Sequence, residues 1–504
     1  MPKKILLVAV EMAEVAAVGG VAEYVLGLAT ALLKQGHDVR VALPAYQYIL
    51  SSQQLQKLPL RLPVPLGVGA SEVTDVYRLE LPCPGNDALK LPVMLLGSHK
   101  HFASVTAPKY IYQWPNPEPW IAFSRAVIEY VNSGDWTPDI IHCQDAHTAL
   151  MPVYIANFRG TDPDRTTPFG QYAAQVRTLL TIHNLLYQGS GDPGLVSYAG
   201  LPSGWFNSTA FEHWGHANCF KAGLTSADMV NTVSKTYAKE IAGRPRFGQG
   251  LEGVLANLTA AKRLRGIVNG IDEARWRMAG VKYDGTDKIE EIIAAKACRR
   301  QKLYGEWGWQ DNGLPIVAFR GRCDYQKNLQ AVAAAAERIM KVANLLIVTW
   351  GYDARDVDPK SLQAWRKLMS LQGDRLRLNT PGLSDKEQTA DNYTIADFFL
   401  MPSRYEPCGL AQMECQRFGT IPIVRKTGGL ADTVSEQPTK QLPSPNGFVF
   451  TGEEGLAVAA AVERAVKSFA DSATRNKFIA NALIQQNSWA TRVPEYEALY
   501  GLTP

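Results

Sequence analysis

The amino-acid sequence predicts an α/β protein with two doubly wound domains. An apolar run at Ile5–Val10 precedes a segment with helical periodicity, Val21–Gln35, and then a second apolar run, Asp38–Leu43. This order indicates a β-α-β unit, because two parallel strands need a crossover connection between them. The alternation returns in the second half of the chain, and 504 residues are enough for two or three domains that each have a core.

Composition indicates an ordinary globular protein and excludes several classes. Hydrophobic residues make up 46% and charged residues 20% of the chain, and the net charge of +4 is too small to indicate a nucleic-acid or membrane surface. Seven cysteines without a C-x-x-C pair predict reduced thiols and a cytoplasmic protein. The N-terminal apolar run is too short for a signal peptide, and no run approaches the roughly 18 apolar residues of a membrane helix.

In the first half of the chain, polar turns follow three predicted strands. Gly19 and Gly20 come after the first strand, Asp145 comes after Ile140–Cys143, and His183 comes directly after Thr178–Ile182. We expect these turns at the carboxyl edge of one sheet, where ligands bind in doubly wound folds. Simpler interpretations stay open, namely a plain tight turn for the glycines, a helix N-cap for Asp145 and a core histidine for His183. Residues 44–119 are rich in proline and predict a β-rich insertion with a loop near 99–116.

The second half repeats the alternation of helix and strand. Its predicted elements are a helix at Ile289–Tyr304, strands at Pro315–Phe319 and Asn344–Thr349, a helix-to-strand step at Ala390–Phe399, and strands at Phe398–Met401, Ile421–Val424 and Pro445–Thr451.

The stretch 401–434 carries a pair of carboxylates and a glycine-rich turn. We expect a helix at Gly409–Phe418, with Glu406 just before its N-terminus, where backbone N–H groups lack partners. Seven residues separate Glu406 from Glu414, which at helical spacing places both on one face. Thr427, Gly428 and Gly429 open a second helix, and such a turn lets backbone amides approach a diphosphate.

At these residues the sequence resembles the bacterial glycogen and plant starch synthases. It carries that family's S-R-[FY]-E-P-C-G-L, G-T-I-P and T-G-G-L-x-D-T-V strings, the T-I-H-N-L-x-Y-Q-G string at 181–189, and the hinge string at Gly266–Asp272. The resemblance implies a GT-B fold, with two Rossmann-like domains facing a cleft. It also implies transfer of glucose, with retention, from a nucleoside diphosphate sugar such as ADP-glucose or UDP-glucose to an α-1,4-glucan.

The resemblance gives the domains and their expected roles. Residues 1–265 would form the acceptor-side domain, 266–484 the domain that binds the nucleotide sugar, and 485–504 a C-terminal helix that returns to the first domain. The expected partners are a nucleotide sugar and a carbohydrate acceptor, and neither a metal nor another cofactor is implied. The sequence does not indicate an oligomeric state.

The resemblance also assigns site residues. Arg322 and Lys327 match the cations that the family uses against the donor phosphates, a role suited to a bidentate arginine and a point-charged lysine. Glu406 would bind sugar hydroxyls, Glu414 the ribose, and His183 the transferred sugar. The implied catalytic set is therefore His183, Arg322, Lys327 and Glu406, and the implied binding set is Gly19, Gly20, Asp145, Asn269, Cys408, Gly409, Leu410, Glu414, Thr427, Gly428 and Gly429.

Three departures from the family pattern leave alternatives open. Ala17 stands where the family's K-x-G-G-L-G-D string has its lysine, and Glu414 restores a pattern of the wider retaining GT-B transferases. The acceptor-side string has become Gln113–Trp120, which keeps Asn116 but places prolines where an aspartate and an arginine are expected. The protein could therefore use another donor sugar or acceptor, or be a catalytically weak regulatory paralogue that binds glucan or nucleotide sugar.

Overall fold

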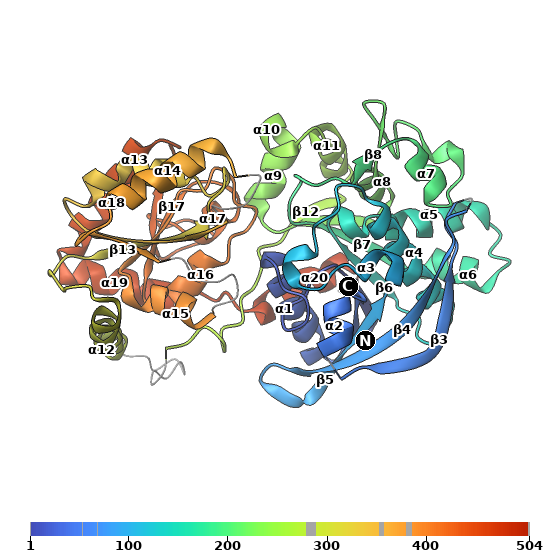
Figure 1. The fold of residues 1–504 in the computed structure, drawn as a ribbon, viewed down its shortest axis with the longest axis horizontal. Coiled ribbons are helices and arrows are strands. Elements are labelled where there is room, and N and C mark those ends of the chain that lie inside the picture. Colours follow the sequence, from blue (N-terminus) through green and yellow to red (C-terminus); the bar gives the residue numbers. More distant parts are fainter. Residues whose placement is uncertain are drawn as a thin grey trace. The chain divides into compact units, whose positions relative to one another are not determined.

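The computed structural model describes residues 2–52, 54–67, 69–278, 289–351, 357–379 and 386–501. The chain forms two compact units, which we call unit 1 (Met1–Gly270 with Trp489–Pro504) and unit 2 (Ile271–Ser488). Figure 1 shows that the red C-terminal helix of the chain lies among the blue and green elements of unit 1. Unit 1 is therefore built from both ends of the sequence.

Unit 1 contains a nine-stranded sheet. From one edge to the other its strands are β12 (Leu264–Gly266), β11 (Met229–Thr232), β7 (Arg177–Ile182), β6 (Ile140–Gln144), β1 (Lys4–Val8), β2 (Asp38–Pro44), β5 (Asn86–Leu96), β4 (Glu72–Cys83) and β3 (Gln56–Val64). The strands from β12 to β5 are parallel, and β4 and β3 add to them as antiparallel strands. The predicted β-rich insertion is confirmed as the outer part of this sheet.

Helices cover the sheet of unit 1, and α1 packs against the C-terminal α20. The helices are α1 (Gly20–Lys34), α2 (Gln47–Ser52), α3 (His99–Phe102), α4 (Glu118–Asn132), α5 (Leu150–Thr161), α6 (Pro168–Gln175), α7 (Gly194–Tyr198), α8 (Cys219–Ser226), α9 (Lys235–Gly243), α10 (Pro245–Gly248), α11 (Glu252–Ala260) and α20 (Val493–Leu499). Short 3-10 turns are η1 (Pro108–Tyr110), η2 (Ala146–Thr148), η3 (Ser203–Trp205) and η4 (Trp489–Thr491), and a small sheet joins β8 (Ser190–Gly191), β10 (His216–Asn218) and β9 (Glu212–His213).

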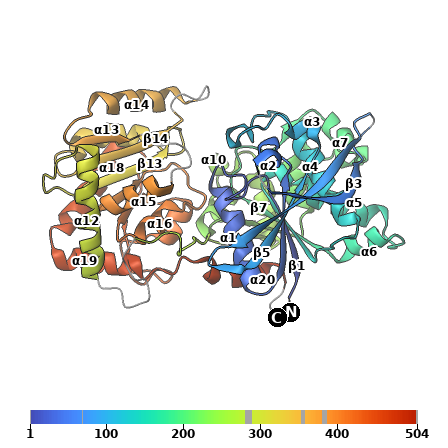
Figure 2. The same ribbon diagram turned by 60° about the horizontal axis from the view of Figure 1, so that its bottom comes forward.

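Unit 2 contains a six-stranded, wholly parallel sheet. Its order is β15 (Leu376–Asn379), β14 (Asn344–Trp350), β13 (Ile316–Arg322), β16 (Phe398–Met401), β17 (Ile421–Arg425) and β18 (Phe448–Phe450). Figures 1 and 2 show α13 (Leu329–Ile339), α14 (Pro359–Ser370) and α18 (Gly455–Phe469) on one face, and α12 (Ile289–Trp307), α15 (Lys386–Ile395), α16 (Ala411–Gln416) and α19 (Ser472–Leu483) on the other. The remaining helix, α17 (Gly428–Thr433), follows β17.

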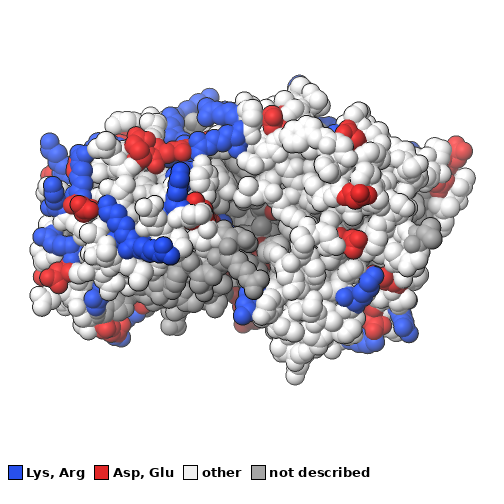
Figure 3. Space-filling view, turned by 45° about the horizontal axis from the view of Figure 1, so that its top comes forward, with Lys and Arg blue, Asp and Glu red and all other residues white. Residues whose placement is uncertain are grey.

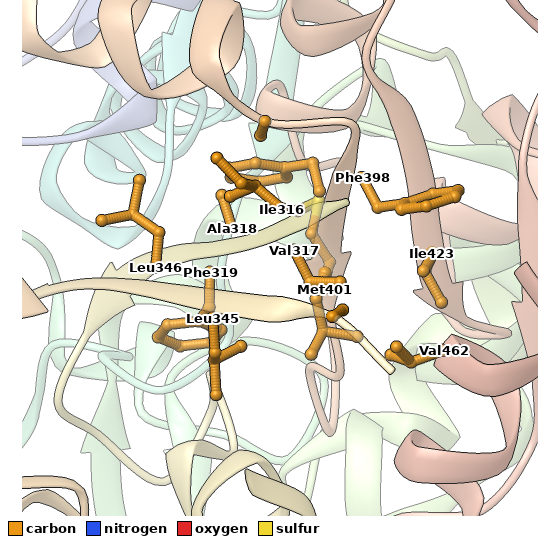
Figure 4. Packing of buried hydrophobic residues seen from close by; sticks show 14 of the residues in the cluster. Ile316, Val317, Ala318, Phe319, Leu345, Leu346, Phe398, Met401, Ile423 and Val462 are labelled. Atoms are coloured by element: carbon orange, nitrogen blue, oxygen red, sulfur yellow. The ribbon is translucent and has the colours of Figure 1, made fainter. Parts of the chain in front are cut away.

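The strands of unit 2 are buried on both faces, which explains their continuous apolar runs. Figure 4 shows side chains of β13 and β14 on both sides of the sheet, with Phe398, Ile423 and Val462 completing the core. Because these runs have no polar face, the sequence marks the strands clearly. The predicted strand Phe398–Met401 is confirmed with those bounds.

One predicted element is wrong in a way that changes the site. The helix expected at Gly409–Phe418 is only Ala411–Gln416, because Gly409 has a left-handed φ of 71° that ends the preceding loop. Glu406 therefore lies in a loop and not directly before a helix N-terminus. Glu406 and Glu414 consequently do not share one helix face.

No helix among the described residues is long and apolar enough to cross a membrane. On the face seen in Figure 3, Lys and Arg side chains gather on unit 2 with Asp and Glu among them, and most of the visible surface of unit 1 is uncharged.

Candidate functional site

In unit 2 the predicted site residues come from three loops at the carboxyl edge of the sheet. The loops follow β13, β16 and β17, which are neighbours, and the strand order reverses between β13 and β16. Such a reversal is where ligands bind in doubly wound folds, because the connections leave it in opposite directions. The predicted residues of this half of the chain are thus brought to one place.

An ion pair joins the first two loops. The Lys327 ammonium lies 2.6 Å from Oε2 of Glu406, and Ser403 Oγ donates to the same oxygen at 2.8 Å. The side chain of Glu406 is 7% exposed and that of Lys327 is 22% exposed. Two groups that the resemblance assigned to catalysis therefore hold each other in a mostly desolvated position. Removing either one would leave the other as a buried charge without compensation.

Arg322 is more open to solvent than Lys327. Its side chain is 56% exposed, and its guanidinium contacts Asp324 at 3.1 Å and Gln326 at 3.3 Å. Gln326 in turn donates to the backbone oxygen of Tyr405, so the loop after β13 is tied to the loop after β16. Both contacts of Arg322 are made by Nη2, so one nitrogen of the guanidinium is held while the exposed side chain stays within reach of an anion.

The glycine-rich turn packs its backbone against the loop of Glu406. Gly429 donates its N–H to the carbonyl oxygen of Glu406 at 3.0 Å. A Cβ atom at Gly428 would overlap that same oxygen, and one at Gly429 would overlap the carbonyl oxygen of Cys408. Gly428 also has a left-handed φ of 44°, so both positions require glycine.

Leu410 and Glu414 lie at the start of α16. Leu410 is the N-cap residue of α16 and Cys408 is buried in the loop before it. The carboxylate of Glu414, in the first turn of α16, accepts a hydrogen bond of 2.7 Å from the hydroxyl of Tyr393 on α15. Glu414 is therefore oriented by α15 and not by Glu406.

In unit 1 the predicted residues also follow neighbouring strands at a reversal of strand order. The turn of Gly19 and Gly20 follows β1, Asp145 follows β6, and His183 follows β7. A Cβ atom at Gly20 would meet none of the described atoms within 4 Å. Asn269 follows β12, and its buried Oδ1 has no hydrogen-bond partner among the described residues.

A carboxylate that the sequence analysis missed occupies the glycine turn. Oε2 of Glu11 accepts the backbone N–H groups of Val18 at 2.9 Å and Gly19 at 2.8 Å, and Oε1 accepts the hydroxyl of Tyr112 at 2.5 Å. Glu11 is 3% exposed, and burial raises its pKa although these three hydrogen bonds lower it. The sequence signal that could have identified Glu11 is its position directly after the predicted first strand, Ile5–Val10.

Asp145 links the second and third turns. Its Oδ1 accepts the N–H groups of His183 at 2.7 Å and Asn184 at 3.3 Å, and burial raises its pKa to about 7. Asp145 stands at the N-cap position of η2, as the simpler interpretation had it, but its side chain makes no capping hydrogen bond there. Asp145 instead fixes the backbone that carries His183.

His183 is a buried, neutral imidazole. Burial lowers its pKa to about 3, and its Nε2 lies 2.9 Å from Oε1 of Gln144. The ring of Tyr24 contacts it edge-on, with the ring centres 4.5 Å apart. Two side chains, Gln144 at the end of β6 and Tyr24 of α1, therefore hold the ring of His183.

Comparisons with known proteins cover nearly the whole chain. Residues 4–257 match the family model described as starch synthase catalytic domain, and residues 309–484 match glycosyl transferases group 1. The chain is 34% identical over 508 residues to a glycogen synthase of Geotalea daltonii and 33% identical over 505 residues to one of Thermotoga maritima, covering 99% of this chain and 98% of each relative.

Solved structures resemble it as well. The catalytic domain of starch synthase IV from Arabidopsis thaliana, bound to ADP and acarbose, matches with a TM-score of 0.83 at 25% identity and covers 99% of both chains. Sucrose-phosphate synthase from Thermosynechococcus elongatus matches with a TM-score of 0.59 at 18% identity, covering 99% of this chain and 100% of that one.

Proposed function

The chain belongs to the family of glycogen and starch synthases, and we propose that it transfers glucose from a nucleoside diphosphate glucose to the end of an α-glucan, with retention of configuration. It is a glycosyltransferase with a two-domain GT-B fold. The observation that carries the proposal in this chain is the Lys327–Glu406 pair, with Arg322 beside it, at the strand-order reversal of unit 2.

The cations of unit 2 would stabilise the departing diphosphate. When the bond between C1 of the sugar and the phosphate oxygen breaks, negative charge grows on the diphosphate, and positioned cations lower the energy of that state. Arg322 is exposed enough to make a bidentate contact, and Lys327 supplies a second charge from beside Glu406. In the glycine-rich turn, the backbone N–H groups of Thr427 and Gly428 would add amide donors, whereas that of Gly429 already donates to the carbonyl oxygen of Glu406. These groups are sufficient for the charge, so we propose that no metal takes part.

Glu406 would bind the sugar and not attack it. Its Oε2 already accepts from Lys327 and Ser403, so the carboxylate is held in place as an acceptor for the 3- and 4-hydroxyl groups. Glu414, held by Tyr393, would accept from the ribose hydroxyls. The acceptor hydroxyl would form the new bond to C1 on the face that the diphosphate leaves, and its proton would pass to the departing phosphate oxygen.

Unit 1 would contribute groups for sugar and acceptor. The neutral imidazole of His183 and the carbonyl of its backbone suit hydroxyl groups, and the buried Oδ1 of Asn269 is an acceptor for which the described residues supply no donor. ADP and acarbose in the starch synthase IV structure support binding of a nucleotide and a carbohydrate in a protein of this family.

A panel of donors tests the proposal. The purified full chain is incubated with glycogen and radiolabelled ADP-glucose, UDP-glucose or GDP-glucose, with and without a chelator, and label in the polymer is counted. UDP-galactose and GDP-mannose serve as matched donors that change only the sugar, and Lys327→Ala serves as the impaired control. We expect label from at least one glucose donor, unaffected by the chelator, and much less from the other sugars.

A second candidate function has one observation in its favour. Ala17 replaces the family's lysine, and the carboxylate of Glu11 already occupies amides of the adjoining turn, so this turn is poor in positive charge. A regulatory paralogue would bind glucan or nucleotide sugar without turnover. Binding of a glucose donor by calorimetry, with no label transferred from any donor, would favour that function over the proposed one.

A further inference from the structure

The segment that follows unit 2 in the chain is seated deep in unit 1. Trp489 begins this segment. Its indole fills the space that side chains at Gly27 of α1 and at Gly270 would otherwise occupy. A Cβ atom at Gly27 would overlap Nε1 of Trp489, and one at Gly270 would lie 2.6 Å from its backbone N. Trp489, Tyr496 and Tyr500 are all nearly or fully buried. We call residues 489–500 the C-terminal segment.

Tyr496 of this segment holds Tyr24, which in turn contacts His183. The hydroxyl of Tyr24 donates to the hydroxyl of Tyr496 at 3.0 Å, and the Trp489 ring lies edge-on to Tyr24 with centres 5.3 Å apart. The other side of Tyr24 contacts the imidazole of His183 edge-on at 4.5 Å and 81°. Since Tyr24 is fully buried, its hydroxyl bond fixes the ring that His183 packs against.

Tyr500 holds a second buried histidine, His142, through a hydrogen-bond network in which each donor can be assigned. Thr181 donates its hydroxyl proton to Oδ1 of Asn231 at 2.6 Å, so its oxygen accepts from Nε2 of His142, also at 2.6 Å. Burial lowers the pKa of His142 to about 3, so the ring is neutral and its Nδ1 is an acceptor. That nitrogen therefore accepts the hydroxyl of Tyr500, at 2.9 Å.

The hydroxyl of Thr181 also lies 3.3 Å from that of Tyr24, which joins this hydrogen-bond network to the ring that contacts His183. Gln144 sets the tautomer of His183. Its amide nitrogen donates to the backbone oxygen of His142 at 3.4 Å, which turns its Oε1 toward His183. Nε2 of His183 therefore carries the proton and donates to Gln144. The tautomer leaves Nδ1 of His183 as the acceptor nitrogen of the ring.

We propose that Tyr496 and Tyr500 are positioning residues that set the orientation of His183 through Tyr24. Tyr496 bonds the hydroxyl of Tyr24 directly, and Tyr500 reaches it through His142 and Thr181. The inference deepens the proposed function, on which it rests for the role of His183 at the transferred sugar. Residues that follow unit 2 in the sequence would thus complete the site of unit 1.

The test removes single hydroxyl groups and keeps the rings. Tyr496→Phe and Tyr500→Phe are compared with Tyr154→Phe, because the hydroxyl of Tyr154 is as buried in unit 1 and donates to the carbonyl oxygen of Ala199 at 3.0 Å, with no bond to this network. Melting temperatures of all three variants establish that each is folded. We expect similar small losses of stability in all three.

Kinetics give the first readout. A buried hydrogen bond contributes about 0.5–1.5 kcal/mol, so we expect kcat to fall about two- to tenfold in Tyr496→Phe and Tyr500→Phe. KM for the glucose donor should change by less than about twofold, because the donor diphosphate is held by other residues. Tyr154→Phe should keep the kcat of the wild type. Equal kcat in all four proteins would overturn the proposal.

The imidazole signals give a readout that needs no turnover. In protein labelled with 15N-histidine, His183 is assigned by the loss of its signals in His183→Gln, and the wild type should show the Nε2–H tautomer. We expect the His183 signals to shift in Tyr496→Phe and Tyr500→Phe and to stay in place in Tyr154→Phe. Unshifted signals in both variants would overturn the positioning role. If the wild type transferred no sugar, the proposed function would fail, and these signals would still decide the inference.

Discussion

At the scale of single residues, Lys327 brings a positive charge into a mostly desolvated position because Glu406 lies 2.6 Å away. Removing either partner would leave the other charge without compensation. Arg322 differs, since more than half of its side chain is exposed and its loss leaves no buried charge behind. The two cations therefore make different contributions to stability, although we propose the same leaving group for both.

We predict that Arg322→Ala and Lys327→Ala both lose kcat by about one to two orders of magnitude, because a charge-assisted hydrogen bond contributes roughly 1.5–3 kcal/mol. Only Lys327→Ala should also lower the melting temperature clearly. Steady-state rates with the native donor and thermal unfolding provide the measurements.

The matched control for these variants is Arg338→Ala. Arg338 lies in the last turn of α13, the helix that begins after the loop of Lys327, and it pairs with Glu463 at 2.6 Å. Its loss should leave kcat unchanged. An Arg322→Ala or Lys327→Ala protein with the kcat/KM of this control would remove the phosphate assignment.

Ala17 is the residue at which the chain departs most informatively from its family. It is exposed, and the backbone amides of the two residues that follow it, Val18 and Gly19, both donate to the carboxylate of Glu11. We therefore predict that Ala17→Lys binds ADP-glucose and UDP-glucose within about twofold of the wild type by calorimetry. One partly exposed charged contact would give roughly fivefold; a gain of that size, with faster glucan elongation, would show that the turn has only lost a phosphate contact.

Residues near each other in sequence were predictable, and residues that meet only in the fold were not. Lys327 and Glu406 were both singled out, but their pairing across 79 residues has no local signal. Glu11 was not singled out, since its partner Tyr112 comes from a loop 101 residues away. The role of Asp145 as an acceptor for the His183 backbone likewise depends on the adjacency of β6 and β7.

At the scale of secondary-structure elements, strands were predicted well because they are uniformly apolar, and short helices poorly. The helix was expected to begin at Gly409, but the left-handed φ of Gly409 and its contact with Gln412 delay the helix to Ala411. The backbone of Gly428 and Gly429 then fills the space beside Glu406 and Cys408. Such close packing of two loops is decided by tertiary contacts that local propensity does not contain.

Helix α1 gives a test of how the C-terminal segment is held. Gly27→Ala would place a methyl group on the indole of Trp489, so we predict a loss of roughly 1–3 kcal/mol in the free energy of unfolding. Gly253→Ala, in α11 of the same unit, would meet no described atom within 4 Å and should be neutral or stabilising by up to about 1 kcal/mol. Denaturant titration of both variants measures the difference. Equal stability of the two would mean that Trp489 is not firmly seated.

At the scale of the whole molecule, buried neutral histidines make stability depend on pH. Burial lowers the pKa of His142 to about 3, below its ordinary value of 6.5. The unfolded chain therefore binds more protons between these values, and the stability that this residue supports is present above pH 6.5 and lost as the pH falls toward 3. His147 and His183 act in the same direction, since burial lowers their pKa values to about 3 too.

We predict that the wild type loses unfolding free energy on acidification below pH 6.5, by up to about 1.4 kcal/mol per pH unit for each proton taken up. The free energy of unfolding of the wild type should therefore approach that of His142→Gln over this range. Taking this difference cancels the effects of Glu11 and Asp145, which act in the opposite direction and are present in both proteins. For His99→Gln, a substitution at an exposed position, the difference in unfolding free energy from the wild type should stay constant with pH. A constant difference for His142→Gln would mean that His142 is not held neutral in the fold.

We propose that this chain transfers glucose with retention, using charges of unit 2 to release the diphosphate. The most direct measurement is a proton NMR time course of the anomeric signals during transfer from the α-configured donor to a short glucan. We expect the first new signal to be that of an α-linked glucose, and Arg322→Ala to slow its appearance without changing its configuration. A β-linked first product, or donor consumption that yields only free glucose, would contradict it.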